Sequence, residues 1–399
     1  MAAQTTEVTD QIAGGRPWPG DGERRPRRPS PVRPPGRWWR PAPRVALLGL
    51  LALLLGYAVS HRPAPDAARA DRKPAASPGP AQPPAEPWLA GHRAAGPAGL
   101  RLLVAGANPR VVDAATGAAT PPPGVRLVPD TGVAAFPVGR SGIAVVEYAW
   151  AAGSYLLLPG ADPQILGRQV TVSRGRDGGL IVVSAARGRT TVLGVGADAR
   201  ERWAWISPDG LTVLGDTPFG LVLQRSGRTA DDRDLVLVDR RSGTARRVLG
   251  HAASAVAAGD HAVAWMPADC VNPCPLRVGD LRTGDRRGYP MPDGWSPRSG
   301  AFAPDGRRVA LTFVPRGGQG RTGRVGVLDL RTGAVAMVPD LGTAPDLGAH
   351  LTWSPDGRWL VIGVPWPDHQ AIALWSPGQP VRVLPTELPG RPGAVTVLP

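Results

Sequence analysis

From about residue 98 to the end of the chain, short apolar runs alternate with turns that contain Gly, Asp and Pro. Leu360–Ile362 is one such run, and it is bounded by Gly363, as expected of a buried strand. Apolar residues at helical spacing are nearly absent from this region. The pattern predicts an all-β domain over residues 98–399.

One turn recurs at a regular distance along this domain. Its three copies are Ser207, Pro208, Asp209 and Gly210; Pro304, Asp305 and Gly306; and Ser354, Pro355, Asp356 and Gly357. Pro presets φ, Asp bonds its own backbone and Gly accepts positive φ, so each copy is predicted to join two strands of a hairpin. Asp305 and Asp356 are 51 residues apart, and Asp209 and Asp305 are 96 apart, or two steps of 48. A period of this size indicates a repeat architecture.

A second recurring element is an apolar strand that ends in Asp and is followed by a turn closed by Gly. Its clear copies are Asp239–Gly243, Asp280–Gly284 and Asp329–Gly333, with an early copy at Asp113–Gly117 and an altered late one at Leu374–Gly378. Two hairpins in each period make four strands, which is one blade of a β-propeller.

The length of the domain sets the number of blades. About 300 residues at about 43 per blade predict seven four-stranded blades. Six remain possible if the degenerate stretches near residues 150 and 185 form a single blade. The first blade lacks a strand, and the apolar run 394–398 at the end of the chain is predicted to supply it, because an open ring would expose two sheet edges.

The turn copies at 205–210, 302–306 and 353–357, each followed by a β run, closely resemble those of the TolB-like, WD-repeat-like propeller family of bacteria. The resemblance covers about residues 98–399. It implies an extracytoplasmic propeller that binds other proteins. Propellers also host unrelated activities, so the resemblance is more specific for the fold than for the function.

The N-terminal part has a different composition. Residues 1–44 are rich in Pro and Arg and are predicted to be a disordered cytoplasmic tail. Residues 45–60 carry no charge and contain seven Leu, which predicts a transmembrane helix. Seven Arg and no acid in residues 25–44 place the N-terminus in the cytoplasm. The Pro/Ala-rich residues 61–97 are then a spacer outside the membrane. A cleaved signal peptide is the alternative.

The net charge of +14 comes from 45 Arg and a single lysine, Lys73. Genomic base composition accounts for this Arg/Lys ratio. Because the predicted compartment lies outside the cytoplasm, a nucleic-acid partner is not expected. A basic surface there would instead face anionic lipid or wall polymer. We expect a monomer that contacts the membrane through its single span and binds an unidentified protein or envelope component.

The sequence offers no catalytic, cofactor-binding or metal site. It has no G-x-S-x-G nucleophile elbow, and none of its six His forms a metal-ligand pair with recognisable spacing. Cys270 and Cys274 flank an Asn-Pro turn and are predicted to form a disulfide. We therefore predict a non-catalytic binding scaffold. The alternatives are an enzyme whose site is assembled in the central channel and a sensor that signals through its cytoplasmic tail.

Overall fold

The computed structural model describes residues 88–398 apart from short gaps, and the described residues form β-strands and no helix. The gaps are 107–108, 125–133, 140–141, 147–152, 169, 187–188, 209, 227–232, 269, 271–273, 317–321, 344–348, 367–368 and 390–392. The predicted tail (1–44), membrane helix (45–60) and most of the linker (61–97) lie outside the described residues. Within the described part, no helix suited to crossing a membrane is present.

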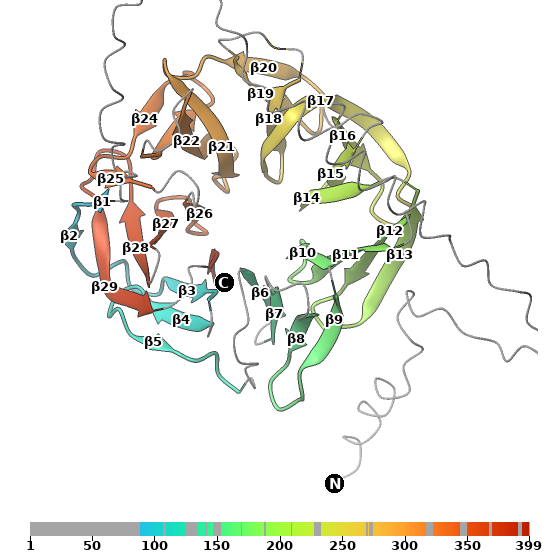
Figure 1. Ribbon diagram of the computed structural model, residues 1–399, viewed down its shortest axis with the longest axis horizontal. Helices are drawn as coiled ribbons and strands as arrows, with labels where there is room; N and C mark the ends of the chain where they lie inside the picture. Colours follow the sequence, from blue (N-terminus) through green and yellow to red (C-terminus); the bar gives the residue numbers. More distant parts are fainter. Residues whose placement is uncertain are drawn as a thin grey trace, which may run out of the picture. The chain divides into compact units, whose positions relative to one another are not determined.

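The strands form antiparallel sheets that stand around a common centre (Figure 1). Named from the centre outward, the first three sheets are β30 (Val395–Val397), β3 (Arg101–Val104), β4 (Arg110–Asp113) and β5 (Ala119–Thr120); β6 (Ala134–Val138), β7 (Gly142–Val146), β8 (Gly153–Leu157) and β9 (Gln164–Arg168); and β10 (Val170–Arg174), β11 (Leu180–Ala186), β12 (Arg189–Val195) and β13 (Glu201–Ser207).

The next sheet has seven strands: β14 (Leu211–Thr217), β15 (Gly220–Ser226), β16 (Arg233–Val238), β17 (Ala245–Ala258), β18 (Ala262–Pro267), β19 (Leu276–Asp280) and β20 (Arg286–Tyr289). The first half of β17 pairs with β16, and its second half, from Ala252, pairs with β18. This one long strand therefore joins two sets of four strands.

The last two sheets of the ring are β21 (Trp295–Phe302), β22 (Arg308–Pro315), β23 (Arg324–Asp329) and β24 (Val335–Met337); and β26 (His350–Trp353), β27 (Leu360–Pro365), β28 (His369–Trp375) and β29 (Arg382–Pro389). An all-β propeller of four-stranded units is thus the fold, as the two recurring turns predict.

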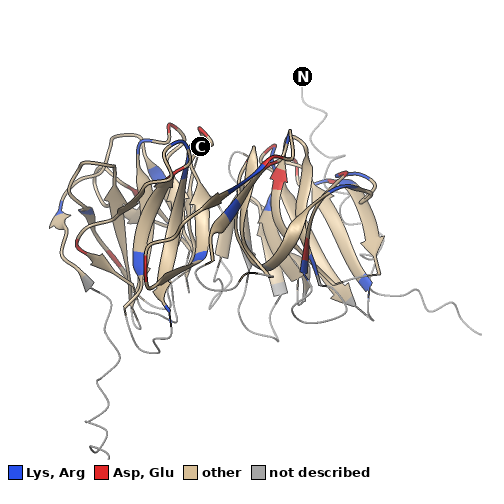
Figure 2. Ribbon diagram, turned by 90° about the horizontal axis from the view of Figure 1, so that it is seen from above, with Lys and Arg blue, Asp and Glu red and all other residues tan. Residues whose placement is uncertain are grey.

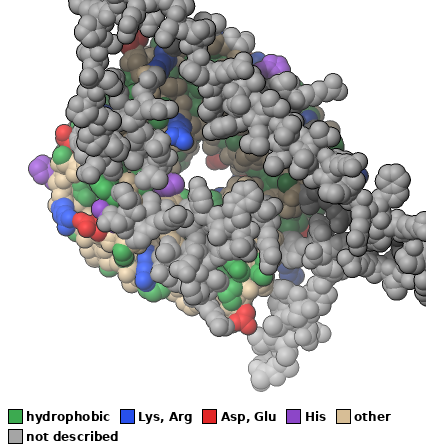
Figure 3. All heavy atoms as spheres, viewed as in Figure 1, with side chains coloured by type: hydrophobic (Ala, Val, Ile, Leu, Met, Phe, Trp, Pro, Cys, Tyr) green, Lys and Arg blue, Asp and Glu red, His purple; other side chains and the backbone are tan. Residues whose placement is uncertain are grey.

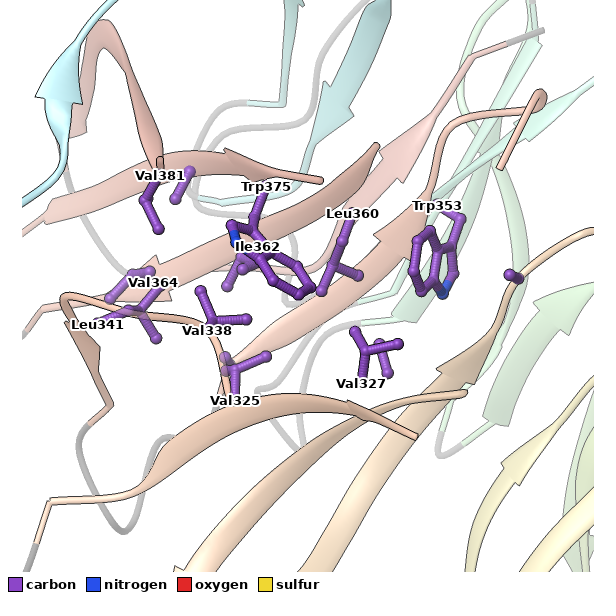
Figure 4. Close-up of a cluster of buried hydrophobic side chains, with 14 residues drawn as sticks. Val325, Val327, Val338, Leu341, Trp353, Leu360, Ile362, Val364, Trp375 and Val381 are labelled. Carbon is purple, nitrogen blue, oxygen red and sulfur yellow. The ribbon is translucent and has the colours of Figure 1, made fainter. Parts of the chain in front are cut away.

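The hydrophobic core lies between neighbouring sheets, so it is divided into separate clusters around the ring. Figure 4 shows one cluster, in which Val325 and Val327 of β23 face Trp353, Leu360 and Ile362 of the following sheet. Comparable clusters join every other pair of neighbouring sheets, including the last and the first. Because each sheet buries both faces, its strands read as continuous apolar runs.

The C-terminal strand closes the ring, as predicted. β30 pairs with β3, with Leu102 opposite Val397 and Val104 opposite Val395. The side-chain amide of Gln370 on β28 holds the start of this strand: its Nε2 donates to the carbonyl of Gly393 at 2.8 Å, and its Oε1 accepts from the Gly393 N–H at 3.1 Å. No local sequence pattern marks Gln370 as part of this closure.

The segment before the ring is also paired. β1 (Trp88–Leu89) pairs with β25 (Leu341–Gly342), and β2 (His92–Arg93) adds in parallel to β29. The ion pair between Arg93 and Glu387 supports the second contact. The composition assigned residues 88–93 to the linker. Within them, His92–Arg93 covers part of the outer edge of the last sheet, an edge that would otherwise be open to pairing with another chain.

Candidate functional site

In each sheet, one turn joins the first strand to the second, and another joins the third strand to the fourth. These two turns lie at the same end of the sheet. We call this side of the ring the turn face. Seen edge-on in Figure 2, acidic and basic residues follow the upper edge of the ring, where the C-terminus also lies. The predicted Asp-to-Gly turns all join third and fourth strands: β4 to β5, β16 to β17, β19 to β20, β23 to β24 and β28 to β29.

The aspartates of these turns bind their own backbone. Asp329 Oδ1 accepts from the N–H groups of Arg331 at 2.9 Å and Thr332 at 2.8 Å, and Gly333 closes the turn with φ of 78°. The hydrogen bond from the Thr332 N–H lowers the pKa of Asp329. In the same way, the N–H groups of Ser242 and Arg241 lower the pKa of Asp239 to about 2. Oδ1 of each carboxylate is occupied by its own turn, so these aspartates shape the turns.

Two of the three predicted Pro-Asp-Gly hairpins are confirmed. Pro304, Asp305 and Gly306 lie between β21 and β22, and Ser354–Gly357 lies between β26 and β27. Gly306 and Gly357 have φ of 66° and 67°. The Ser354 hydroxyl donates to Asp356 Oδ1 at 2.5 Å, which lowers the pKa of Asp356.

The hairpin predicted at Ser207, Pro208, Asp209 and Gly210 is wrong. β13 ends at Ser207 as the outermost strand of one sheet, and β14 begins at Leu211 as the innermost strand of the next. The segment therefore crosses from one sheet to another, and Asp209 lies outside the described residues. A Pro-Asp-Gly sequence serves either kind of connection, since it fixes only local backbone angles.

A groove of about 370 Å³ opens on the turn face between the sheet of β10–β13 and the strands β14–β17. We call it the Trp203 groove. Asp216, with a side chain only 7% exposed, lies at its base. Its carboxylate accepts from the Arg240 guanidinium at 2.6 Å and from the Arg176 backbone N–H at 2.9 Å. The same guanidinium donates to the Thr217 carbonyl at 2.8 Å. These bonds consume the acceptors at the base of the groove.

Glycines make room for the aromatic wall. A Cβ on Gly194 would lie 2.1 Å from Cε2 of Trp203, so only glycine lets the indole rest on β12. A Cβ on Gly196 would lie 2.5 Å from Nε of Arg202, which is paired with Asp198 at 2.8 Å. The half-buried indole therefore presents a flat apolar surface beside the arginines.

The remaining polar groups of the groove are mostly donors. Among the described residues, the guanidinium groups of Arg176 and Arg241 and the indole N–H of Trp203 make no hydrogen bond or ion pair. Asp177 adds one exposed carboxylate. Four arginines and two aspartates line the groove, and the buried aspartate is already bound. Such a surface suits a ligand that combines negative charge with an apolar part.

The other predicted site is the disulfide, which is confirmed: Cys270 and Cys274 are bonded, with Cα atoms 5.6 Å apart. It lies between β18 and β19, at the opposite ends of the strands from the turn face. His251 Nδ1 lies 2.6 Å from Asp234 Oδ1 on the neighbouring strand.

The centre of the ring is open in the space-filling view, with basic and histidine side chains beside the opening (Figure 3). His350 begins β26, the innermost strand of the last sheet, and burial lowers its pKa. It has no hydrogen-bond partner among the described residues. The described residues contain no cluster of His, Cys, Asp and Glu suited to a metal ion.

Comparison with known proteins adds similarities of fold. No protein-family model and no curated protein matches the chain. Among solved structures, TolB from Acinetobacter baumannii is 15% identical with a TM-score of 0.44, and the match covers 75% of this chain and 66% of TolB. An oligogalacturonate lyase in complex with manganese is 17% identical with a TM-score of 0.43, and the match covers 72% of this chain and 86% of the lyase. An apocarotenoid oxygenase from Synechocystis is 9% identical with a TM-score of 0.46, and the match covers 78% of this chain and 95% of the oxygenase. The chain thus spans just under two thirds of the length of TolB.

Proposed function

We propose that this protein is a membrane-anchored, extracytoplasmic propeller of seven blades that acts as a non-catalytic binding scaffold for a protein, peptide or envelope component. The blade number is supported by dividing the long sheet at β17, which leaves seven sets of four strands. The anchor and its orientation rest on the uncharged residues 45–60 and on the arginines before them.

The observation that carries the binding role is the Trp203 groove. Its buried acceptor, Asp216, is saturated by Arg240 and the Arg176 N–H. The guanidinium groups of Arg176 and Arg241 and the Trp203 indole N–H have no partner in the part of the chain that the structure describes. Exposed donors of this kind gain most from charged acceptors, because charge-assisted hydrogen bonds are about twice as strong as neutral ones.

The ligand class follows from the combination of charge and indole. A peptide segment in which an acidic residue is close to an apolar one places its carboxylate on Arg176 or Arg241 and its apolar side chain on Trp203. Trp and Arg are also the residue types that contribute most at protein interfaces. The scaffold therefore binds an acidic, partly apolar segment of its partner.

The test uses the full chain in nanodiscs of neutral lipid and a fluorescent peptide of alternating Glu and Leu. Fluorescence anisotropy should show saturable binding that weakens about tenfold in an Arg176→Ser/Arg241→Ser variant and in Trp203→Leu. Arg358→Ser is the matched control, since Arg358 is equally exposed on the turn face but lines no described groove. Equal binding by all four proteins, or equal binding of a Lys/Leu peptide, would rule out this site.

A further inference from the structure

A second groove on the turn face is lined almost entirely by charged residues. It has a volume of about 560 Å³ and lies where the edge of β20 approaches the turns of the following sheet, β21–β24. We call it the Arg308 groove. Its lining residues are Arg287, Asp305, Gly306, Arg307, Arg308, Asp329, Leu330 and Arg331. Unlike the Trp203 groove, it has no aromatic wall.

Three of the four carboxylate oxygens of the Arg308 groove, which are Asp329 Oδ1 and both oxygens of Asp305, already accept hydrogen bonds. Asp329 accepts from two backbone N–H groups and from the Thr332 hydroxyl at 3.0 Å. Asp305 accepts from the Arg307 N–H at 2.9 Å and from the Arg308 guanidinium at 3.3 Å. The Leu330 carbonyl is also occupied, because the Tyr289 hydroxyl donates to it at 2.8 Å. The groove therefore keeps few free acceptors.

One arginine is fixed in position. The Arg308 guanidinium donates to the carbonyl of Gly357 at 2.8 Å and lies over the Trp353 ring, 5.0 Å from its centroid. Its side chain is only 24% exposed. Because these contacts come from the neighbouring sheet, Arg308 presents its remaining N–H groups from a pre-organised position, so less conformational entropy is lost when a ligand binds.

Three other arginines line the groove. Arg287, Arg307 and Arg331 are exposed, and among the described residues their guanidinium groups make no ion pair or hydrogen bond. Like charges that share a concave surface raise the local positive potential and attract anions. The net charge of the lining is +2, from four arginines and two aspartates.

We propose that the Arg308 groove binds the phosphate groups of a polyanion. The planar guanidinium fork matches phosphate oxygens in bidentate pairs, and several arginines from separate turns can reach successive phosphates. A carboxylate peptide is the poorer match, since Leu330 is the one large apolar residue of the lining. The phosphates belong either to a soluble or wall-linked polymer or to anionic lipid headgroups. This site is independent of the Trp203 groove.

The experiment measures tripolyphosphate binding by titration calorimetry, with the full chain in phosphatidylcholine nanodiscs. Binding should weaken about tenfold in Arg307→Ser/Arg331→Ser and should weaken with added salt. Arg200→Ser, an exposed arginine on the turn between β12 and β13, should bind like the parent. Arg331→Lys keeps the positive charge but loses the guanidinium fork, so its affinity for tripolyphosphate should lie between that of the parent and that of Arg307→Ser/Arg331→Ser. Thermal unfolding of each variant checks that the ring is intact.

Two further arms identify the source of the phosphate and test the chemistry. Flotation of the nanodiscs with phosphatidylglycerol vesicles, sensitive to the same double substitution, assigns the groove to lipid headgroups. Tripolyphosphate binding without flotation assigns it to a polymer. The proposal is overturned if neither ligand binds, if the Arg307/Arg331 variant binds as the parent does, or if citrate binds as tightly as tripolyphosphate. The Arg176→Ser/Arg241→Ser variant should bind tripolyphosphate as the parent does. A failure of the proposal for the Arg308 groove is therefore distinguishable from a failure of the proposal for the Trp203 groove.

Discussion

Replacing Gln370 by alanine should loosen the closure of the ring. The Gln370 amide, 1% exposed, satisfies both the N–H and the carbonyl of Gly393, which lies two residues before the closing strand. Alanine leaves both backbone groups without their partner in a buried site. An unsatisfied buried group costs about 1–3 kcal/mol, so we expect a loss of about 2–4 kcal/mol once some water reaches the site.

That loss converts to a measurable shift in melting temperature. With an unfolding entropy of about 2.1 cal/mol/K per residue over roughly 300 residues, the melting temperature should fall by about 3–6 °C. Gln370→Glu places a carboxylate oxygen against the Gly393 carbonyl in a buried site, so its melting temperature should fall at least as much as that of the alanine variant. The control is Gln379→Ala, an exposed position in the turn after β28.

The assay combines thermal circular dichroism with hydrogen exchange. The Gln370→Ala variant should exchange faster at Val395–Val397 and at their partners in β3, while the sheet of β10–β13 stays protected. A melting temperature within 1 °C of the parent, together with unchanged exchange in β30, would show that the amide clamp does not hold the ring closed.

Three other predictions concern closure, pH and topology. Deleting residues 391–399 removes β30 and exposes the edge of β3, so the protein should melt at a lower temperature and aggregate; a monomeric variant that melts like the parent would contradict ring closure by β30. Burial lowers the pKa of His350 below 6.5, so the neutral side chain favours the fold above pH 6.5, and this stability is lost as the pH falls from 6.5 toward the folded-state pKa. Between pH 7.5 and pH 5, the melting temperature should therefore decline less in a His350→Asn variant than in the parent. Parallel declines in the two proteins would refute the assignment. Protease added to intact spheroplasts should leave a tail of about 60 residues, as expected from the span at 45–60, whereas a mature N-terminus near His61 would indicate cleavage.

Local sequence signals predicted most of the fold, because propeller blades repeat local hairpins. Asp280 and Asp329 mark turns through bonds to their own backbone, so the sequence alone reveals them. The error at Ser207–Gly210 has the same origin: the turn chemistry is local, but whether the next strand pairs with the previous one is decided by distant partners.

The two grooves were not predictable in the same way. Arg176 and Arg240 lie in the turns after β10 and β16, whereas Trp203 lies on β13, and no spacing along the chain links them. The unusual signal was glycine within a strand: Gly194 interrupts an apolar run because the Trp203 indole occupies the space of its Cβ. Gln370 likewise looked like an ordinary polar residue, since its partner Gly393 is 23 residues away.

The most direct test of the scaffold proposal is photo-cross-linking in the native envelope. A photoreactive phenylalanine at Trp203 of the full-length protein should capture an acidic envelope component, and the adduct should disappear when Arg176 and Arg241 are replaced by serine. The same probe at Gln379 should capture nothing comparable. Equal labelling at the two positions, or an adduct that persists without the two arginines, would contradict a binding role for the Trp203 groove.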